Sequence, residues 1–86
     1  MTTPAGTVRL LFFARYAELV GREEASLALS LPATVGDVVR RVRDELPGAG
    51  ELPERPLTAV NQRHVRMDAP VADGDEVAFL PPLAGG

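Results

Sequence analysis

Alternating apolar positions predict the first strand of the chain. In residues 7–14, TVRLLFFA, the even-numbered positions from Val8 to Phe12 are apolar and share one face of an extended strand. The positions between them include two more large apolar residues, Leu11 and Phe13. We therefore predict a central strand that is covered on both faces, or one whose second face meets a partner.

Two further segments complete the N-terminal third. Residues 15–21, RYAELVG, predict a short helical turn that ends at Gly21, because glycine readily adopts the left-handed conformation of a helix C-terminus. In residues 25–31, ASLALSL, three leucines alternate with small or polar residues, which is typical of a half-buried strand. We expect this strand to pair antiparallel with the first.

Residues 33–48, ATVGDVVRRVRDELPG, predict the main helix. Thr34 can cap it, Asp37 completes a capping-box pattern three residues later, and Pro47 and Gly48 end it. One apolar stripe runs along it at helical spacing: Val35, Val38, Val39, Val42 and Leu46. Since valine is a mediocre helix former, packing against a sheet must stabilise this helix.

The rest of the chain predicts a loop and three strands. Residues 47–57 are rich in proline and glycine and predict the loop, and residues 57–67 predict two short strands with a turn at Asn61-Gln62. A second turn at Asp73-Gly74 precedes a final strand that ends at Leu80. In this strand, Val77 and Phe79 share one face, and Ala78 and Leu80 share the other.

The order β-β-α-β-(β)-β with one amphipathic helix predicts α+β architecture. If the first and last strands lie side by side in the centre, the fold is the β-grasp, or ubiquitin-like, fold: a mixed sheet of four to five strands packed on one main helix. We predict a single domain over residues 1–80 and an extended C-terminal tail over residues 81–86.

The amino-acid composition excludes several classes of reactive and binding site. The 86 residues contain no cysteine and no lysine, so thiolate nucleophiles, disulfides and cysteine-based zinc sites are excluded. The net charge of −3 argues against nucleic-acid binding, which needs a clustered basic face. No P-loop, GxGxxG or paired-carboxylate motif occurs, and the acidic run at 73–76, DGDE, lacks EF-hand spacing, so we interpret it as a turn. We expect no bound cofactor and no metal.

The sequence also predicts where the protein is found. No apolar stretch approaches the roughly 20 residues of a membrane span. The first residues, MTTPAGTV, lack the basic and apolar regions of a signal peptide. We therefore expect a cytoplasmic protein.

The C-terminal residues, PPLAGG, predict an extended segment that leaves the sheet rather than a further strand. Pro81-Pro82 cannot continue a sheet ladder and favour extended backbone, so residues 81–86 reach roughly 18–20 Å. Leu83 offers one apolar anchor, while Ala84 and the two glycines after it are narrow enough for a channel. The alternative is an idle, frayed terminus.

A terminal carboxylate reacts only after activation, because its oxygen is a poor leaving group. ATP can convert it to an acyl-adenylate, from which a sulfur nucleophile displaces AMP and leaves a thiocarboxylate, or an amine or thiol forms a conjugate. The absence of cysteine fits the first route, since any sulfur that this chain carries must then sit on the terminal carbonyl of Gly86.

Three stretches together resemble one known family: VRLLFFARYAELVG at 8–21, AVNQ at 59–62 and DGDEVAFLPPLAGG at 73–86. The family that they resemble is the small subunit of molybdopterin synthase (molybdopterin converting factor subunit 1), a family of ubiquitin-like sulfur carriers. The resemblance implies that an E1-like enzyme adenylylates Gly86 with ATP, and that a sulfurtransferase or cysteine desulfurase system makes the thiocarboxylate. Gly85 and Gly86 match the functional tail of that family.

The same resemblance implies a partner. The tail would enter the active site of the large synthase subunit, in a heterotetramer of two small and two large subunits, and donate sulfur for the dithiolene of molybdopterin during molybdenum cofactor biosynthesis. The chain would then be the non-catalytic, sulfur-donating subunit.

We also predict a docking surface for this partner. Leu11, Phe13 and Leu80 fall on the sheet face that one helix cannot cover, and His64 is expected at its rim as a contact rather than a catalytic base. A loop folded over these residues is the alternative. The predicted partner-binding set is Leu11, Phe13, His64, Leu80, Pro81, Pro82, Leu83 and Ala84.

Three other functions remain open from the sequence. The chain could be a carrier for thiamine or another sulfur pathway, a modifier that conjugates through Gly86 to lysines of targets, or an interaction module with an idle tail. Carriers of the first kind generally lack the FFAR opening and the FLPP lead into the tail, so we rank them below molybdopterin synthase.

Overall fold

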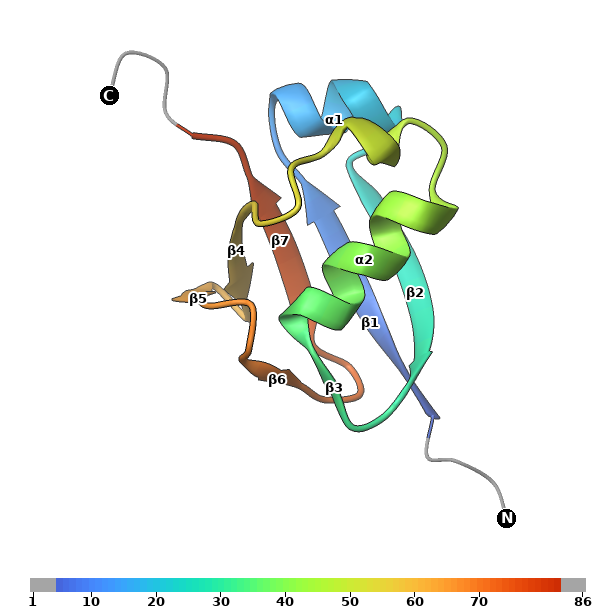
Figure 1. The fold of residues 1–86 in the computed structure, drawn as a ribbon, viewed down its shortest axis with the longest axis vertical. Helices are drawn as coiled ribbons and strands as arrows, with labels where there is room; N and C mark the ends of the chain where they lie inside the picture. Colours follow the sequence, from blue (N-terminus) through green and yellow to red (C-terminus); the bar gives the residue numbers. More distant parts are fainter. Residues whose placement is uncertain (1–4, 83–86) are drawn as a thin grey trace.

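The structure is a computed structural model that describes residues 5–82 (Figure 1). The elements in chain order are β1 (Ala5–Phe12), α1 (Arg15–Val20), β2 (Glu24–Ser30), β3 (Ala33–Thr34), α2 (Val35–Glu45), a 3₁₀ turn (Ala49–Glu51), β4 (Leu57–Val60), β5 (Arg63–Val65), β6 (Pro70–Val71) and β7 (Glu76–Leu80).

The main sheet has five strands in the order β2-β1-β7-β4-β5. Its two central strands, β1 and β7, run parallel, with Arg9 opposite Glu76 and Phe12 opposite Phe79. The other neighbouring pairs are antiparallel, so the sheet is mixed. The first and last strands therefore lie side by side in the centre, which confirms the predicted β-grasp arrangement.

The structure adds two features that the sequence analysis did not predict. Strands β3 and β6 form a separate antiparallel pair of two residues each, and a 3₁₀ turn lies inside the predicted loop at 47–57. A strand of two residues has too few positions to show an alternating pattern. The first strand also ends at Phe12 rather than at residue 14.

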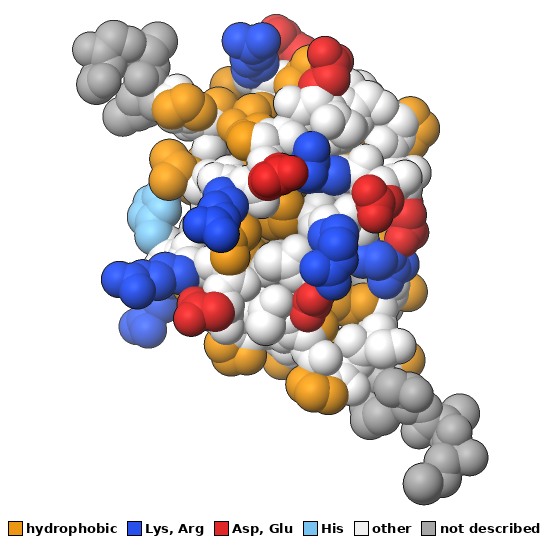
Figure 2. Space-filling model, in the orientation of Figure 1, with side chains coloured by type: hydrophobic (Ala, Val, Ile, Leu, Met, Phe, Trp, Pro, Cys, Tyr) orange, Lys and Arg blue, Asp and Glu red, His pale blue; other side chains and the backbone are white. Residues whose placement is uncertain are grey.

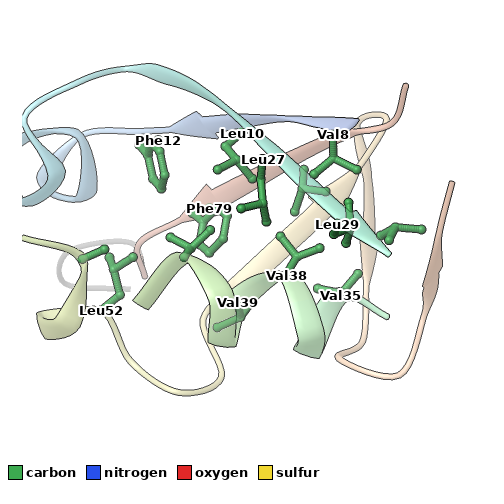
Figure 3. Packing of buried hydrophobic residues seen from close by; sticks show 14 of the residues in the cluster. Val8, Leu10, Phe12, Leu27, Leu29, Val35, Val38, Val39, Leu52 and Phe79 are labelled. Atoms are coloured by element: carbon green, nitrogen blue, oxygen red, sulfur yellow. The ribbon is translucent and has the colours of Figure 1, made fainter. Parts of the chain in front are cut away.

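The hydrophobic core lies between one face of the main sheet and α2 (Figure 3). Figure 3 shows Val8, Leu10 and Phe12 of β1 directed toward the helix that carries Val35 and Val38, with Leu27, Leu29 and Phe79 filling the space between. The rings of Phe12 and Phe79 pack with their centroids 5.2 Å apart. Burying one valine or leucine side chain contributes about 1.5–3 kcal/mol, so the packing of this face against α2 stabilises the fold.

Helix α2 begins at the predicted capping box. The Thr34 hydroxyl accepts the backbone N–H of Asp37 at 3.2 Å, and the Asp37 carboxylate accepts the backbone N–H of Thr34 at 2.9 Å. Four of the five predicted stripe residues are buried, and Leu46 is half-buried at the C-terminal end. The predicted helix is thus confirmed, and its packing compensates for the modest helix propensity of valine.

Both predicted turns are present. Asn61 and Gln62 have φ values of 50° and 70°, as a tight two-residue hairpin turn requires. The Asn61 side chain also accepts the backbone N–H of Glu76 at 3.0 Å and donates to Asp75 at 3.0 Å, so it fastens this hairpin to the start of β7. The second turn has Gly74 at φ 88°.

Two negative findings apply to residues 5–82 only. No helix there is long and apolar enough to cross a membrane. No group of three or more histidine or acidic side chains there could hold a metal ion.

Candidate functional site: the open sheet face and the tail-side hollow

The sheet face opposite α2 carries an apolar row next to the point where the chain leaves β7. Leu57 of β4 lies opposite Leu80 of β7. On the other side of Leu80, the backbone N–H of Phe13 donates to the carbonyl of Phe79 at 3.4 Å, which brings Phe13 beside the end of β7. Phe13 is 45% exposed and Leu57 is 54% exposed, and they are the two exposed large hydrophobic residues of the described part. Two of the three predicted patch residues, Phe13 and Leu80, therefore lie together with Leu57 in an apolar row at this end of the face.

The same face becomes charged toward its opposite end. Arg9 forms ion pairs with Glu76 at 3.2 Å and Glu24 at 3.5 Å. Exposed pairs of this kind contribute only about 0–1 kcal/mol each to stability. They make the two ends of the face chemically different, so a partner with an apolar contact surface is directed to the end near Leu80.

A hollow of about 1020 Å³ lies around the exit of the chain from β7, and we call it the tail-side hollow. It is lined by Phe13, Ala14, Arg15, Tyr16, Leu19, Glu51, Pro53, Leu57, His64, Leu80, Pro81 and Pro82. Most of these side chains are apolar. Figure 2 shows hydrophobic side chains gathered where the chain leaves the domain. An exposed apolar surface of this kind usually marks an interface.

The backbone between β1 and α1 shapes one wall of this hollow. Ala14 has φ 48° and ψ −123°, a conformation that non-glycine residues rarely adopt. This sharp reversal ends β1 and begins α1, with the N–H of Tyr16 donating to the carbonyl of Phe13 at 3.0 Å. Strain of this type persists only where the surrounding structure holds it, and it is common at functional sites.

The structure brings together five of the predicted partner-binding residues. Phe13, His64, Leu80, Pro81 and Pro82 all line the tail-side hollow.

Leu11 does not join this set. It is half-buried and lines a neighbouring hollow of about 350 Å³ with Glu23 and Glu24, and this hollow shares Phe13 and Ala14 with the tail-side hollow. Its place in the β1–β7 register, opposite Ala78, puts it one row away from the exit of the chain. The predicted site residues Leu83, Ala84, Gly85 and Gly86, and most of the predicted tail at 81–86, lie outside the described residues.

Sequence reasoning missed several residues of the hollow. Leu57, Tyr16, Leu19 and Pro53 come from β4, α1 and the loop before β4, and all line it. Only Leu57 had a usable signal: it alternates with Thr58 along a predicted strand, and pairing that strand with β7 would have placed it beside Leu80. The other three depend on how α1 and the loop fold against each other.

The described residues around the tail-side hollow offer mainly apolar contact surface. His64 is exposed on β5, lies opposite Ala59 and is one of the residues that line the hollow. No described acid, base or nucleophile is paired with it. The arrangement can hold an apolar partner surface at the base of a segment whose sequence ends in Gly85-Gly86.

The fold and this exit segment define a ubiquitin-like β-grasp protein. Residues 10–86 match the ThiS family, and the chain belongs to that family.

Relatives and solved structures agree with this assignment. The chain is 36% identical to the molybdopterin synthase sulfur carrier subunit of Escherichia coli (92% of this chain, 99% of the relative), and 39% identical to small archaeal modifier protein 3 of Haloferax volcanii (92% and 98%). The crystal structure of SAMP1 from Haloferax volcanii has a TM-score of 0.80 at 28% identity, covering 94% of this chain and all of that one. A chain in the complex of subunits 1 and 2 of molybdopterin-converting factor from Helicobacter pylori has a TM-score of 0.64 at 25% identity (93% and 99%).

Proposed function

We propose that this protein is the sulfur carrier subunit of a molybdopterin synthase. The observation that carries the proposal is the position of the tail-side hollow. It surrounds the exit of the chain from the central strand β7, directly before the sequence that ends in Gly85-Gly86. A partner bound there receives the C-terminal segment while it contacts the domain.

The chemistry takes place on the terminal carboxylate. A carboxylate oxygen of Gly86 attacks the α-phosphate of ATP on an E1-like enzyme, and pyrophosphate leaves. A persulfide sulfur of a sulfurtransferase or cysteine desulfurase system then attacks the acyl carbon and displaces AMP. A thiol of that system cleaves the resulting acyl disulfide, which leaves the thiocarboxylate on Gly86 and a disulfide on the enzyme. This thiocarboxylate is the sulfur-donating form of the carrier, and we propose that the domain binds no cofactor of its own.

The proposed acceptor is the large synthase subunit. Its support is the similarity to a chain in the complex of subunits 1 and 2 of molybdopterin-converting factor. The apolar residues around the exit supply the contact area, and the narrow C-terminal residues reach the acceptor site. This chain then donates sulfur for the dithiolene, and the acceptor subunit supplies the catalytic groups.

The test is the intact mass of the pure protein after incubation with ATP, an E1-like enzyme and a sulfur donor. We expect one oxygen to be replaced by sulfur, within the peptide that contains Gly86 and only when ATP is present. A variant that lacks Gly86 is the matched control and should stay unchanged. An unaltered mass, with an enzyme preparation that loads a known carrier, would refute the proposal.

A second candidate function is protein modification, which the 39% identity to small archaeal modifier protein 3 favours. The same activated Gly86 would then form an amide with lysines of target proteins. High-molecular-weight adducts that resist reducing agent, and that disappear when Gly86 is deleted, would support modification. Sulfur transfer to the large subunit without such adducts would support the carrier.

A further inference from the structure

Positive charge is concentrated in one segment of this acidic protein. Residues 55–67, RPLTAVNQRHVRM, contain three arginines, the single histidine and no acid. The rest of the chain has six arginines and twelve acids, a formal charge of −6. A local charge of this sign on a protein of net charge −3 creates a field that attracts a negatively charged partner to one place.

The fold places this segment at one edge of the main sheet. Strand β5 is the last strand in the sheet order. Beside it, Arg55, Arg66 and His64 line a hollow of about 360 Å³, together with Leu57 and Met67, and we call it the basic hollow. Figure 2 shows basic side chains gathered next to the histidine on this side of the molecule.

The arginines of this segment differ from most others in the described part. Arg9, Arg40, Arg41 and Arg43 each form an ion pair within residues 5–82. In the same range, neither Arg55 nor Arg63 nor Arg66 does so. Their charge is therefore available to an external group.

The basic hollow is continuous with the tail-side hollow. Leu57 and His64 line both. A partner that covers the exposed Leu57 side chain while it receives the C-terminal segment therefore extends over Arg55 and Arg66.

From this continuity and the charge, we infer that the basic hollow binds an acidic segment of the same partner protein that receives the tail. The inference rests on the proposed function and specifies its partner: the large synthase subunit carries aspartate or glutamate side chains that contact Arg55 and Arg66. The adjoining apolar surface favours a protein over a nucleic acid, since nucleic-acid sites are built around phosphate contacts. Complementary charges at such a place raise the association rate and fix the orientation of docking.

The test uses the full-length chain and the large subunit from the same organism. The variant Arg55→Glu/Arg66→Glu is compared with Arg22→Glu/Arg40→Glu, which has the same change in net charge on other parts of the surface. Circular dichroism verifies that both variants fold. Isothermal titration calorimetry then gives the dissociation constant Kd at several salt concentrations.

We expect Arg55→Glu/Arg66→Glu to weaken binding at least about tenfold at low salt, and the control to weaken it less than about twofold. The salt dependence of Kd should fall in the first variant only, because screening acts on charge pairs. The variant Arg55→Lys/Arg66→Lys should keep most of the affinity.

Other results would overturn the inference. Equal losses in both charge-reversal variants would indicate a general effect of net charge. If Arg55→Glu/Arg66→Glu weakens binding to RNA or to the E1-like enzyme but not to the large subunit, the basic hollow binds a different ligand. If the unaltered protein fails to bind the large subunit, the proposed function is wrong and the inference falls with it. If that binding persists and the Arg55→Glu/Arg66→Glu variant binds equally well, only the inference is wrong.

Discussion

At the scale of single residues, two glycines with the same backbone conformation have different surroundings. Gly21 has φ 81° and Gly48 has φ 82°. A Cβ atom at Gly21 would meet nothing within 4 Å. At Gly48, it would overlap the carbonyl oxygen of Leu19. The backbone after α2 therefore approaches the end of α1 so closely that no side chain fits between them.

This difference predicts unequal effects of alanine. Gly21→Ala should destabilise the protein by about 1–2 kcal/mol, the ordinary cost of a left-handed conformation. Gly48→Ala should cost clearly more, because the clash with backbone forces α1 and the turn after α2 apart. Urea unfolding of the two variants measures the difference. Equal losses would show that the two segments separate freely.

At the scale of elements, α2 depends on the capping box at its N-terminus. The hydrogen bond from the Thr34 backbone, followed by that from the Arg40 side chain, holds the pKa of the Asp37 carboxyl below its ordinary value. A carboxyl whose pKa is lower in the folded state stabilises the protein above the pKa of the unfolded chain, about 4. That contribution is lost as the pH falls through the lowered folded-state pKa.

Removing the carboxyl should therefore change the pH dependence of stability. In Asp37→Asn, we expect a smaller fall in the free energy of unfolding between neutral pH and acid pH than in the unaltered protein. Thr34→Ala should lower stability by about 0.5–2 kcal/mol, since it removes the other half of the box, and Thr34→Ser should restore most of it. Urea titrations at a series of pH values measure both. An unchanged pH profile in Asp37→Asn would contradict the role of its charge.

The elements also show which parts of the fold can be predicted from sequence. The stripe from Val35 to Val42 and the Thr34–Asp37 box are local patterns, and both were confirmed. The turn at Asn61-Gln62 follows from the tolerance of Asn for positive φ. By contrast, β3 and β6 depend on a long-range pairing of Ala33 with Val71, which two residues cannot signal.

The candidate site was less predictable, because it is a property of several elements together. Phe13 and Leu80 were found from alternation along their own strands. Tyr16 and Pro53 reach the tail-side hollow only because α1 and the loop before β4 lie against the same exit. Leu11 satisfied the same alternation as Phe13, yet only Phe13 reaches the tail-side hollow, because a strand pattern gives the face on which a residue lies and not its position along the strand.

At the scale of the whole molecule, binding and stability should be separable. Phe13 and Leu57 are about half exposed, whereas Leu52 is 1% exposed in the core. We expect Phe13→Ala/Leu57→Ala to lower the free energy of unfolding by only about 1–2 kcal/mol in total, since each side chain is about half exposed, but to weaken binding to the large subunit more than about tenfold.

Two controls complete this comparison. Leu52→Ala should lower stability by about 2–5 kcal/mol through the cavity that it leaves. Asp44→Ala, an exposed position on α2, should affect neither property. Calorimetric binding and urea unfolding measure all three variants. Unchanged affinity in the double variant would exclude the tail-side hollow as the docking surface.

The parallel pairing of β1 with β7 determines when the sheet can fold during synthesis of the chain. Arg9 is synthesised early and its partner Glu76 late, so the centre of the sheet stays open while almost the entire chain is made. Contacts between residues so far apart in sequence form slowly. The apolar side chains of β1 therefore stay exposed to solvent until β7 pairs with β1. Residues 81–86 follow directly after β7. If the proposed activating enzyme recognises the closed sheet, we expect it to discriminate against misfolded chains before it activates their C-terminal carboxylates.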